Sequence, residues 1–460
     1  MMKAMDEHVD TSEETFDLEE ELDLEDVSME ATTQNHSTVL ATPSRKHEVL
    51  ELQHNALEPP SDDFARARSL REQMGSSSPL MGIFGLYQNI VDLRNDLEWA
   101  NDAAYRRLHK EPYISWKAFL KNKADHGDYV SVAIVGVLWV YMLVAFAVGG
   151  FEFAPLRNNP MLGPTADTLI EAGAVHQPLL EHVGYMRLFS AIFLHAGLIH
   201  LLCNSVALWV VGPMVERVYG SWNMLWIFVI SGYGGNIASA FFLPQGVSVG
   251  ASGGILGLVG TMLADIYVNL NILVMVHKSE GKLLNICGSM GWMLVEIVLL
   301  LGLGLIPYVD NFAHLGGLAY GFFFGMLFVR QLYTGHNFES PAKGYYFLMG
   351  VSRTVYVIVG LFFFMSTFGM LIRGFDGNVL CPWCRYMSCA PMPFWANSEE
   401  DLWWRCDPCA TASGRLVGDD LELHCPFYGE TVDLVVSPEL TLHEIEKNLP
   451  DYCRAHCDLY

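Results

Sequence analysis

Basic residues are scarce in this sequence, which holds 27 Lys and Arg against 51 Asp and Glu and has a formal net charge of −24. Proteins bind nucleic acid through basic surface, so the composition excludes nucleic acid as a partner. The N-terminus also lacks the apolar stretch of a secretory signal peptide and the arginine-rich character of a mitochondrial presequence. We therefore expect the first membrane-spanning segment to serve as the targeting signal.

Charge of either sign is nearly missing from the middle of the chain. Hydrophobic residues make up 52% of the sequence, which is too apolar for a soluble protein, and the acidic residues concentrate within 6–30 and after Arg373. This distribution predicts a membrane core with polar segments on both sides. The predicted regions are a disordered acidic cytosolic tail over 1–80, a basic helical juxtamembrane region over 81–128, a transmembrane domain over 129–373 and a lumenal or extracellular Cys-rich domain over 374–460.

Seven apolar stretches of the central region are long enough to cross a lipid bilayer. They are Tyr129–Phe151, Leu188–Val211, Trp222–Leu243, Ala251–Val276, Leu283–Ile306, Phe312–Val329 and Thr354–Ile372. Basic residues collect before the first stretch and in alternate loops, which by the positive-inside rule places the N-terminus in the cytosol. Seven spans then place the C-terminal tail in the lumen or outside the cell. The predicted fold class is an all-α polytopic membrane protein.

Several of these spans contain polar side chains, which are costly in a membrane and so need a partner or a function. The second span holds His200 and Asn204, whose i, i+4 spacing places them on one helix face. The fourth span opens on Ser252, and the sixth holds His314 near its start. The predicted topology places His200, Ser252 and His314 in the outer half or the middle of the bilayer.

Small residues would let the helices that carry these groups approach closely. Glycines recur at four-residue spacing on the fourth and the sixth span, and such stripes allow close contact between helix backbones. The glycines are Gly253 and Gly257 on the fourth span and Gly317, Gly321 and Gly325 on the sixth. Close approach is what a hydrogen bond between the short Ser252 side chain and His314 requires.

The same residues suit nucleophilic catalysis. A serine hydroxyl needs a base to become a good nucleophile, and His314 could take its proton. His200 and Asn204 could stabilise an oxyanion. Asp265 lies too far along the fourth span to act as a third member, so the residues predict a Ser/His dyad. Taken alone, Ser252 would instead be a small packing residue, and Asn204 a hydrogen-bonding contact between helices.

Three short motifs, HLLCN at 200–204, GASG at 250–253 and AHLGG at 313–317, occur in this order on spans two, four and six. Together they resemble those of the rhomboid intramembrane serine proteases, and the resemblance covers about Tyr185 to Val329. A six-helix core with a seventh span at the C-terminal end resembles the eukaryotic secretase-type branch. The resemblance implies Ser252 as the nucleophile, His314 as the base, His200 and Asn204 as the oxyanion-side pair, and Gly250 and Gly253 as the glycines that bracket the serine.

The resemblance implies an endopeptidase that needs no metal and no cofactor and cuts single-pass transmembrane proteins within or near the outer leaflet. Two positions depart from the family pattern: Met186-Arg187 stands for Trp-Arg, and Leu256 stands for a tyrosine that packs on the histidine. One alternative is a catalytically silent rhomboid-like factor that binds or traffics membrane proteins, and a channel or transporter is a weaker one. Secretory-pathway membranes and the plasma membrane both fit, and the acidic tail leaves room for cytosolic partners.

Cysteines concentrate in the tail, where eight of the ten follow the last predicted span. The pairs in CPWC, CDPC and CRAHC are spaced like zinc ligands, and His424 and His456 could complete such sites. The predicted topology instead places the tail where disulfides form. It therefore favours up to four disulfides, whose pairing the sequence does not determine.

Overall fold

A computed structural model describes most of the chain from Ala65 to Cys457. The described residues are 65–69, 82–108, 129–156, 159–180, 184–244, 246–279, 281, 283–305, 309–332, 343–375, 377, 380–381, 384–390, 409, 412–417, 420–424, 431–436 and 441–457. The predicted disordered tail, apart from 65–69, and the predicted juxtamembrane residues 109–128 lie outside this part of the chain.

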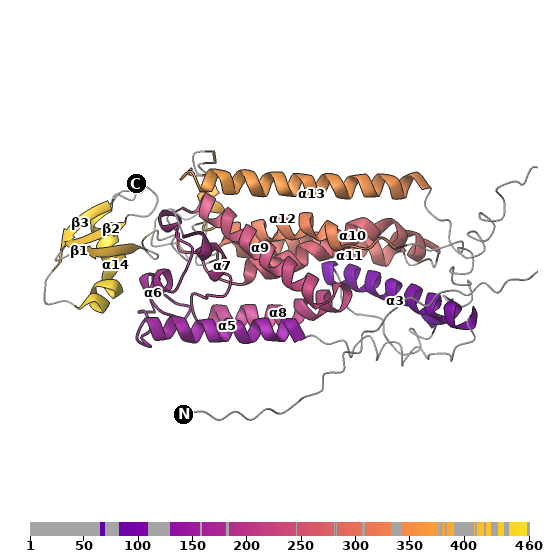
Figure 1. Ribbon diagram of the computed structural model, residues 1–460, viewed down its shortest axis with the longest axis horizontal. Coiled ribbons are helices and arrows are strands. Elements are labelled where there is room, and N and C mark those ends of the chain that lie inside the picture. The colour runs from indigo at the N-terminus through magenta and orange to yellow at the C-terminus, as the bar shows by residue number, and fades with distance from the viewer. Residues whose placement is uncertain are drawn as a thin grey trace, which may run out of the picture. The chain divides into compact units, whose positions relative to one another are not determined.

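Long helices run side by side and form a bundle (Figure 1). Seven of them correspond to the predicted spans: α5 (Tyr129–Val148), α8 (Leu198–Tyr219), α9 (Ser221–Phe242), α10 (Ser252–Ser279), α11 (Leu283–Leu303), α12 (Asn311–Phe328) and α13 (Lys343–Leu371). Within the described part of the chain, all of these but α12 are long and apolar enough to cross a membrane. The protein is therefore a multi-pass helical membrane protein, which confirms the predicted fold class.

The predicted sixth span corresponds to α12, which has 18 residues. Asn311, His314 and four glycines dilute its apolar character. It nevertheless packs against α9, α10 and α13, so it lies within the bundle. Among the six helices apolar enough to span a membrane, α9 and α10 are the most buried, with 61% and 67% of their apolar windows inside the protein, whereas the values for α11 and α13 are 6% and 11%. The helix that begins at Ser252 is thus central, and α11 and α13 present most of their surface outward.

The predicted second span begins ten residues too early. The structure places α7 (Arg187–Ser190) and a loop before α8, which starts at Leu198. The N–H groups of Leu198 and Ile199 donate to the carbonyls of Leu162 and Met161 at 3.1 and 3.2 Å. The first turn of α8 therefore satisfies its backbone donors on the loop that follows α5, rather than through an extension of the helix.

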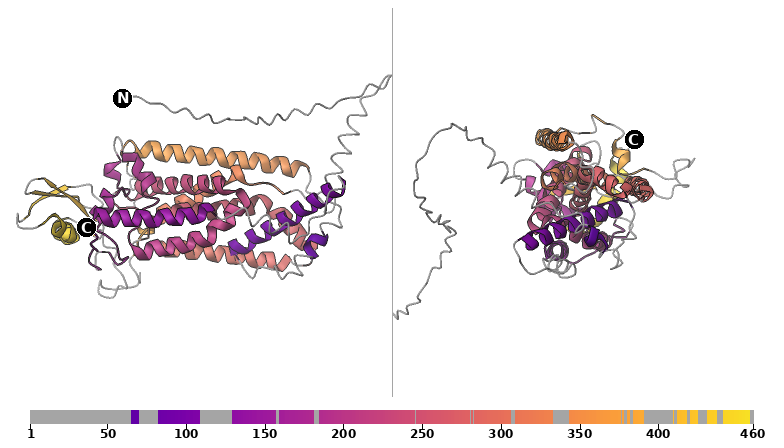
Figure 2. Two further views of the ribbon diagram at one scale, coloured as in Figure 1. Left: turned by 60° about the horizontal axis from the view of Figure 1, so that its bottom comes forward. Right: turned by 90° about the vertical axis from the view of Figure 1, so that its right-hand side faces the viewer.

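A helix precedes the predicted spans and packs on the bundle. The prediction of helical structure after residue 81 is met by α3 (Gly82–Leu108). Leu86, Tyr87 and Ile90 are fully buried, and α3 contacts α10 and α11 at the end of the bundle away from α7 (Figures 1 and 2). This packing was not predicted, because α3 lacks the continuous apolar run by which the other helices were recognised.

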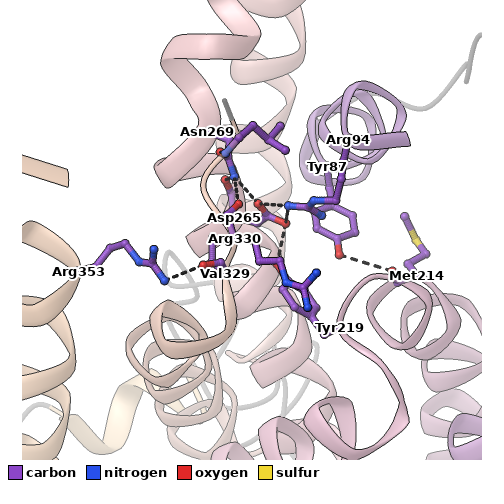
Figure 3. Close-up of polar contacts among 10 residues, drawn as sticks. Tyr87, Arg94, Met214, Tyr219, Asp265, Asn269, Val329, Arg330 and Arg353 are labelled. Atoms are coloured by element: carbon purple, nitrogen blue, oxygen red, sulfur yellow. Dashed lines mark hydrogen bonds and ion pairs between the residues drawn. The ribbon is translucent and has the colours of Figure 1, made fainter. Parts of the chain in front are cut away.

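An ion pair buried among helices fixes α3 (Figure 3). Arg94 Nη2 on α3 donates to both carboxylate oxygens of Asp265 on α10 at 3.0 and 3.1 Å, and the two side chains are 7% and 0% exposed. The Tyr219 hydroxyl and Asn269 Nδ2 also donate to this carboxylate, both at 2.6 Å. Asp265 lies thirteen positions after Ser252, about 20 Å along the helix. The network thus joins α3, α8 and α10 far from Ser252.

The C-terminal region holds a small sheet that the sequence interpretation did not predict. The antiparallel strands are β1 (Ser413–Val417), β2 (Asp420–His424) and β3 (Thr431–Val435), in that order, and α14 (Leu442–His456) follows them. Leu421 and Leu423 alternate along β2 and so share one face, where they cluster with Ile445 and Leu449 of α14. Only this short alternation, between polar turns, signalled a strand.

Disulfides tie the C-terminal region together, as the sequence predicted. Cys381 bonds to Cys384, which is the CPWC pair, and Cys409 bonds to Cys453 of α14. Cys389 and Cys457 are also disulfide-bonded. The described cysteines of the tail are therefore used as disulfide partners, which agrees with the disulfide interpretation rather than with zinc binding.

Candidate active site

The GASG segment makes a tight turn directly before α10. Gly250 has φ +136°, a backbone conformation that side chains other than glycine rarely adopt. Its N–H donates to the Ala191 carbonyl at 2.9 Å, and the buried Ala251 leads into Ser252, the first residue of α10. The turn therefore fixes the entry of the chain into α10 and leaves the Ser252 side chain half-buried rather than sealed in the core.

His200 and Asn204 lie against the backbone of this turn. A Cβ atom at Gly250 would meet His200 Cε1 at 2.8 Å and Asn204 Nδ2 at 3.8 Å. The two side chains come from successive turns of α8, as their spacing predicted. The structure thus brings three predicted site residues together, two positions before Ser252, and Gly250 is the residue type that the contact with the imidazole ring requires.

Asn204 brings an unused hydrogen-bond donor to this place. Its side chain is 5% exposed, and its Nδ2 atom has no hydrogen-bond partner among the described residues. A buried donor without a partner costs free energy and is unusual in native proteins. His195, which we did not assign a catalytic role, is fully buried and makes an edge-to-face contact with the His200 ring at 5.1 Å between centroids.

The glycine stripes of α10 and α12 meet along three successive turns. A Cβ atom at Gly317 would lie 2.7 Å from the Cα atom of Gly253, and one at Gly321 would overlap the backbone of Gly257. One turn further, a Cβ atom at Gly325 would lie 3.0 Å from Thr261 Cα. The backbones are therefore in direct contact, as the small-residue pattern predicted.

This contact brings the first turns of α10 and α12 together. A Cβ atom at Gly253 would lie 3.2 Å from the Ala313 carbonyl oxygen, so the residue after Ser252 touches the residue before His314. Within the described residues, Ser252 and His314 share no hydrogen bond, and His314 Nδ1 is buried without a partner. The helices carrying the two groups are thus adjacent, and the histidine has a ring nitrogen still available.

The close contact predicts a stability effect at Gly317. Gly317→Ala is expected to destabilise the protein by about 1–3 kcal/mol, because backbone atoms would have to move to admit the methyl group. Gly350→Ala on α13 is the matched control: a Cβ atom there meets nothing within 4 Å, so the helix propensity of alanine should stabilise the protein by up to about 1 kcal/mol. Thermal unfolding in detergent would show shifts of opposite sign, and equal shifts would contradict the contact.

One functional candidate was missed. Asp310 immediately precedes α12 as its N-cap, and its side chain accepts a hydrogen bond from the Ala313 N–H at 2.9 Å. The sequence did hold a signal, since an aspartate just before an apolar helical run is a typical cap. A carboxylate was sought only inside the predicted spans, and Asp310 lies just outside one.

Among the described residues no group of three or more His, Cys, Asp or Glu could hold a metal ion.

Comparison with known proteins assigns the class. The rhomboid domain model matches residues 182–331, which contain every predicted site residue. RHOMBOID-like protein 1 of Arabidopsis thaliana is 32% identical over 305 residues, which cover 63% of this chain and 73% of that protein. The rhomboid protease GluP of Bacillus subtilis is 40% identical over 186 residues, 40% of this chain and 34% of GluP. The chain belongs to the rhomboid family.

The family includes both proteases and a member that is named as inactive. Inactive RHOMBOID-like protein 8 of Arabidopsis thaliana is 31% identical to this chain over 266 residues, which cover 55% of the chain and 73% of that protein. Membership therefore defines a rhomboid-like multi-pass membrane protein, and the activity has to be argued from the residues of the site.

Proposed function

We propose that this protein is an intramembrane serine endopeptidase that cleaves transmembrane proteins by a Ser252/His314 dyad. The observation that carries the proposal is the turn at Gly250, where His200 and the unpaired Asn204 amide lie against the backbone that leads into Ser252. The contact between the first turns of α10 and α12 supports it, because His314 stands one residue from that contact. Catalytic hydrogen bonds often form only once substrate is bound, so a Ser252–His314 bond is expected in the complex.

In the proposed reaction the Ser252 hydroxyl attacks the carbonyl carbon of the scissile peptide and gives its proton to His314. The tetrahedral intermediate collapses when its C–N bond breaks, and His314 protonates the amine that leaves. A water molecule then gives a proton to His314 and attacks the acyl-enzyme, which releases the new carboxyl end and restores the serine. The proton that Ser252 loses leaves with the amine, and His314 passes the proton taken from water to the Ser252 oxygen, so both residues end the cycle as they began it.

The oxyanion formed in both steps needs hydrogen-bond donors that are already in place. Asn204 Nδ2 and the His200 ring are the proposed donors, because they line the turn next to the nucleophile and Nδ2 has no hydrogen-bond partner among the described residues. A donor that is fixed before the reaction loses little entropy in the transition state. The energetic cost of the unpaired amide in the free protein would then be recovered when the oxyanion binds.

The proposed substrates are single-pass transmembrane proteins. A helical substrate must unwind locally before attack, because its carbonyl groups are hydrogen-bonded within the helix. With the N-terminus in the cytosol, as the basic residues predict, Ser252 lies toward the outer or lumenal leaflet and cleavage occurs within or near it. The proposed location is the secretory pathway or the cell surface, with the disulfide-bonded tail outside the cytosol and the acidic tail open to cytosolic partners.

The alternative function is that of a catalytically silent rhomboid-like factor that binds or traffics membrane proteins. Two observations favour it: an inactive relative is 31% identical to this chain, and Leu256 replaces the tyrosine of the family pattern. The side chains of Ser252 and His314 are nevertheless both present and half-buried, which a silent protein does not require.

Labelling with a serine-reactive fluorophosphonate tests the proposal without knowledge of the substrate. The probe is expected to modify wild-type protein at Ser252, because only a hydroxyl with a working base reacts readily. His314→Ala should lose the label while staying folded. A folded wild-type protein that stays unlabelled would support the silent alternative.

A further inference from the structure

A carboxylate next to the proposed dyad holds the first turn of α12. The backbone carbonyl of Asp310 accepts a hydrogen bond from the His314 N–H at 3.2 Å, and its Oδ1 accepts one from the Ala313 N–H. The negative charge also stands at the helix N-terminus, where the helix dipole favours it. Asp310 thus fixes the start of α12, and with it the position of the proposed base.

The other carboxylate oxygen reaches two neighbouring elements. Asp310 Oδ2 accepts hydrogen bonds from the Ser248 hydroxyl, at 2.5 Å, and from the Ser239 hydroxyl on α9. Ser248 lies four residues before Ser252 and is anchored in turn, because its backbone exchanges two hydrogen bonds of 3.0 Å with Val175. One side chain therefore joins the start of α12, the end of α9 and the segment that leads into the nucleophile.

We propose that Asp310 is a positioning residue for the proteolytic reaction, which sets the separation of Ser252 and His314 by joining the elements that carry them. The inference rests on the proposed function. Asp310 is then a third group beside the Ser252/His314 dyad, which was predicted from the residues of the spans alone.

The bonding pattern requires a carboxylate. Two serine hydroxyls and one backbone N–H all donate to this side chain, and an ionised carboxylate accepts at both of its oxygens. Asparagine has one accepting oxygen, which would cap α12. Its NH2 group would face the hydroxyls of Ser239 and Ser248, which would then have to accept hydrogen bonds instead of donating them. Hydrogen bonds to a charged acceptor are also stronger than neutral ones. Asparagine should therefore preserve the helix cap and weaken the bridge.

The charge has a second effect on the reaction. Asp310 stands one turn before His314 and within electrostatic range of it. His314 becomes positively charged when it takes the serine proton, and a nearby anion stabilises that charge. His200 is also an electrostatic neighbour of His314. It carries no negative charge, so it cannot stabilise the protonated His314 as Asp310 can.

The test measures kcat and KM for cleavage of a single-pass transmembrane substrate by purified full-length protein. Rates are expressed per active site, counted by fluorophosphonate labelling run to completion. Asp310→Ala should lower kcat by about 10- to 100-fold, because misplacement of reacting groups by about 1 Å has effects of this size. KM should stay near the wild-type value, since Asp310 is not expected to touch the substrate. Asp310→Asn should retain more activity than the alanine variant.

Ser248→Ala and Ser239→Ala keep the test decisive if the Asp310 variants fold poorly. Each should lower kcat less than Asp310→Ala, and neither should lower it further when added to Asp310→Ala, because residues of one bridge are coupled. Asp451→Asn is the matched control, since this aspartate makes an exposed ion pair with Arg454 on α14. Its kcat should equal that of the wild type.

The outcomes separate the two proposals. Equal kcat per active site in the wild type and the Asp310 variants would overturn the positioning role, as would a smaller folded fraction with unchanged kcat. A folded wild type that neither labels nor cleaves would overturn the proposed function, and the positioning role with it.

Discussion

Ser252→Ala is expected to lower the rate of substrate cleavage by about a million-fold, the loss seen when the nucleophile of a serine protease is removed. Among the described residues, Ser252 is the hydroxyl that directly follows the Gly250 turn, so its removal takes away the proposed nucleophile. The measurement is release of the outer fragment of a single-pass substrate, first in cells that co-express both proteins and then with purified protein in detergent.

Ser366→Ala on α13 is the control, because this half-buried serine lies on a helix at the outside of the bundle. The Ser366→Ala protein should cleave the substrate at the wild-type rate. Cleavage by the Ser252→Ala protein in cells would point to another protease, which the purified protein would then exclude or confirm. If the wild type binds substrate and leaves it uncut, the serine has no catalytic function and the trafficking alternative stands.

Arg94→Met is expected to destabilise the protein by about 3–5 kcal/mol, the cost of leaving one partner of a buried ion pair without the other. Asp265 is completely buried and would keep only the Tyr219 and Asn269 donors. The loss should be measured as a lower midpoint of unfolding in detergent. Docking of α3 should loosen as well, which faster proteolysis within Gly82–Leu108 would show.

The same substitution at an exposed arginine provides the control. Arg373→Met, just after α13, removes a solvent-exposed guanidinium and should change stability by less than about 0.5 kcal/mol. Adding Asp265→Leu to Arg94→Met should recover part of the loss, because the unpaired charge is then removed. Equal unfolding midpoints for Arg94→Met and Arg373→Met would show that the buried pair does not hold α3 in place.

The spans were predictable because lipid imposes a simple rule, and six of the seven helices carry the required apolar run. The docking of α3 was not, because its polar contact with α10 joins Arg94 and Asp265, which are 171 positions apart. Asp265 appeared in the sequence as a carboxylate too distant from Ser252 for catalysis. The structure shows why α10 carries it there: its partner comes from a helix before the first span.

The candidate site also has features that the sequence predicted and features that it did not. The placement of His200 and Asn204 on one face and the glycine contacts followed from helical periodicity, which is local. The cap formed by Asp310 had a local signal, but its hydrogen bonds to Ser239 and Ser248 had none, because these serines precede it by 71 and 62 positions and no periodicity relates them. Only the tertiary fold brings such groups together.

The unequal burial of the helices should also be visible in how the protein has diverged. α11 has 6% of its apolar window buried inside the protein, and α10 has 67%. Lipid accepts any apolar side chain, so α11 can exchange Leu, Val, Ile and Met freely as long as it stays hydrophobic. On α10 most positions are constrained by a neighbouring backbone or side chain, and natural variants of this protein should therefore accumulate on α11 and be rarer on α10.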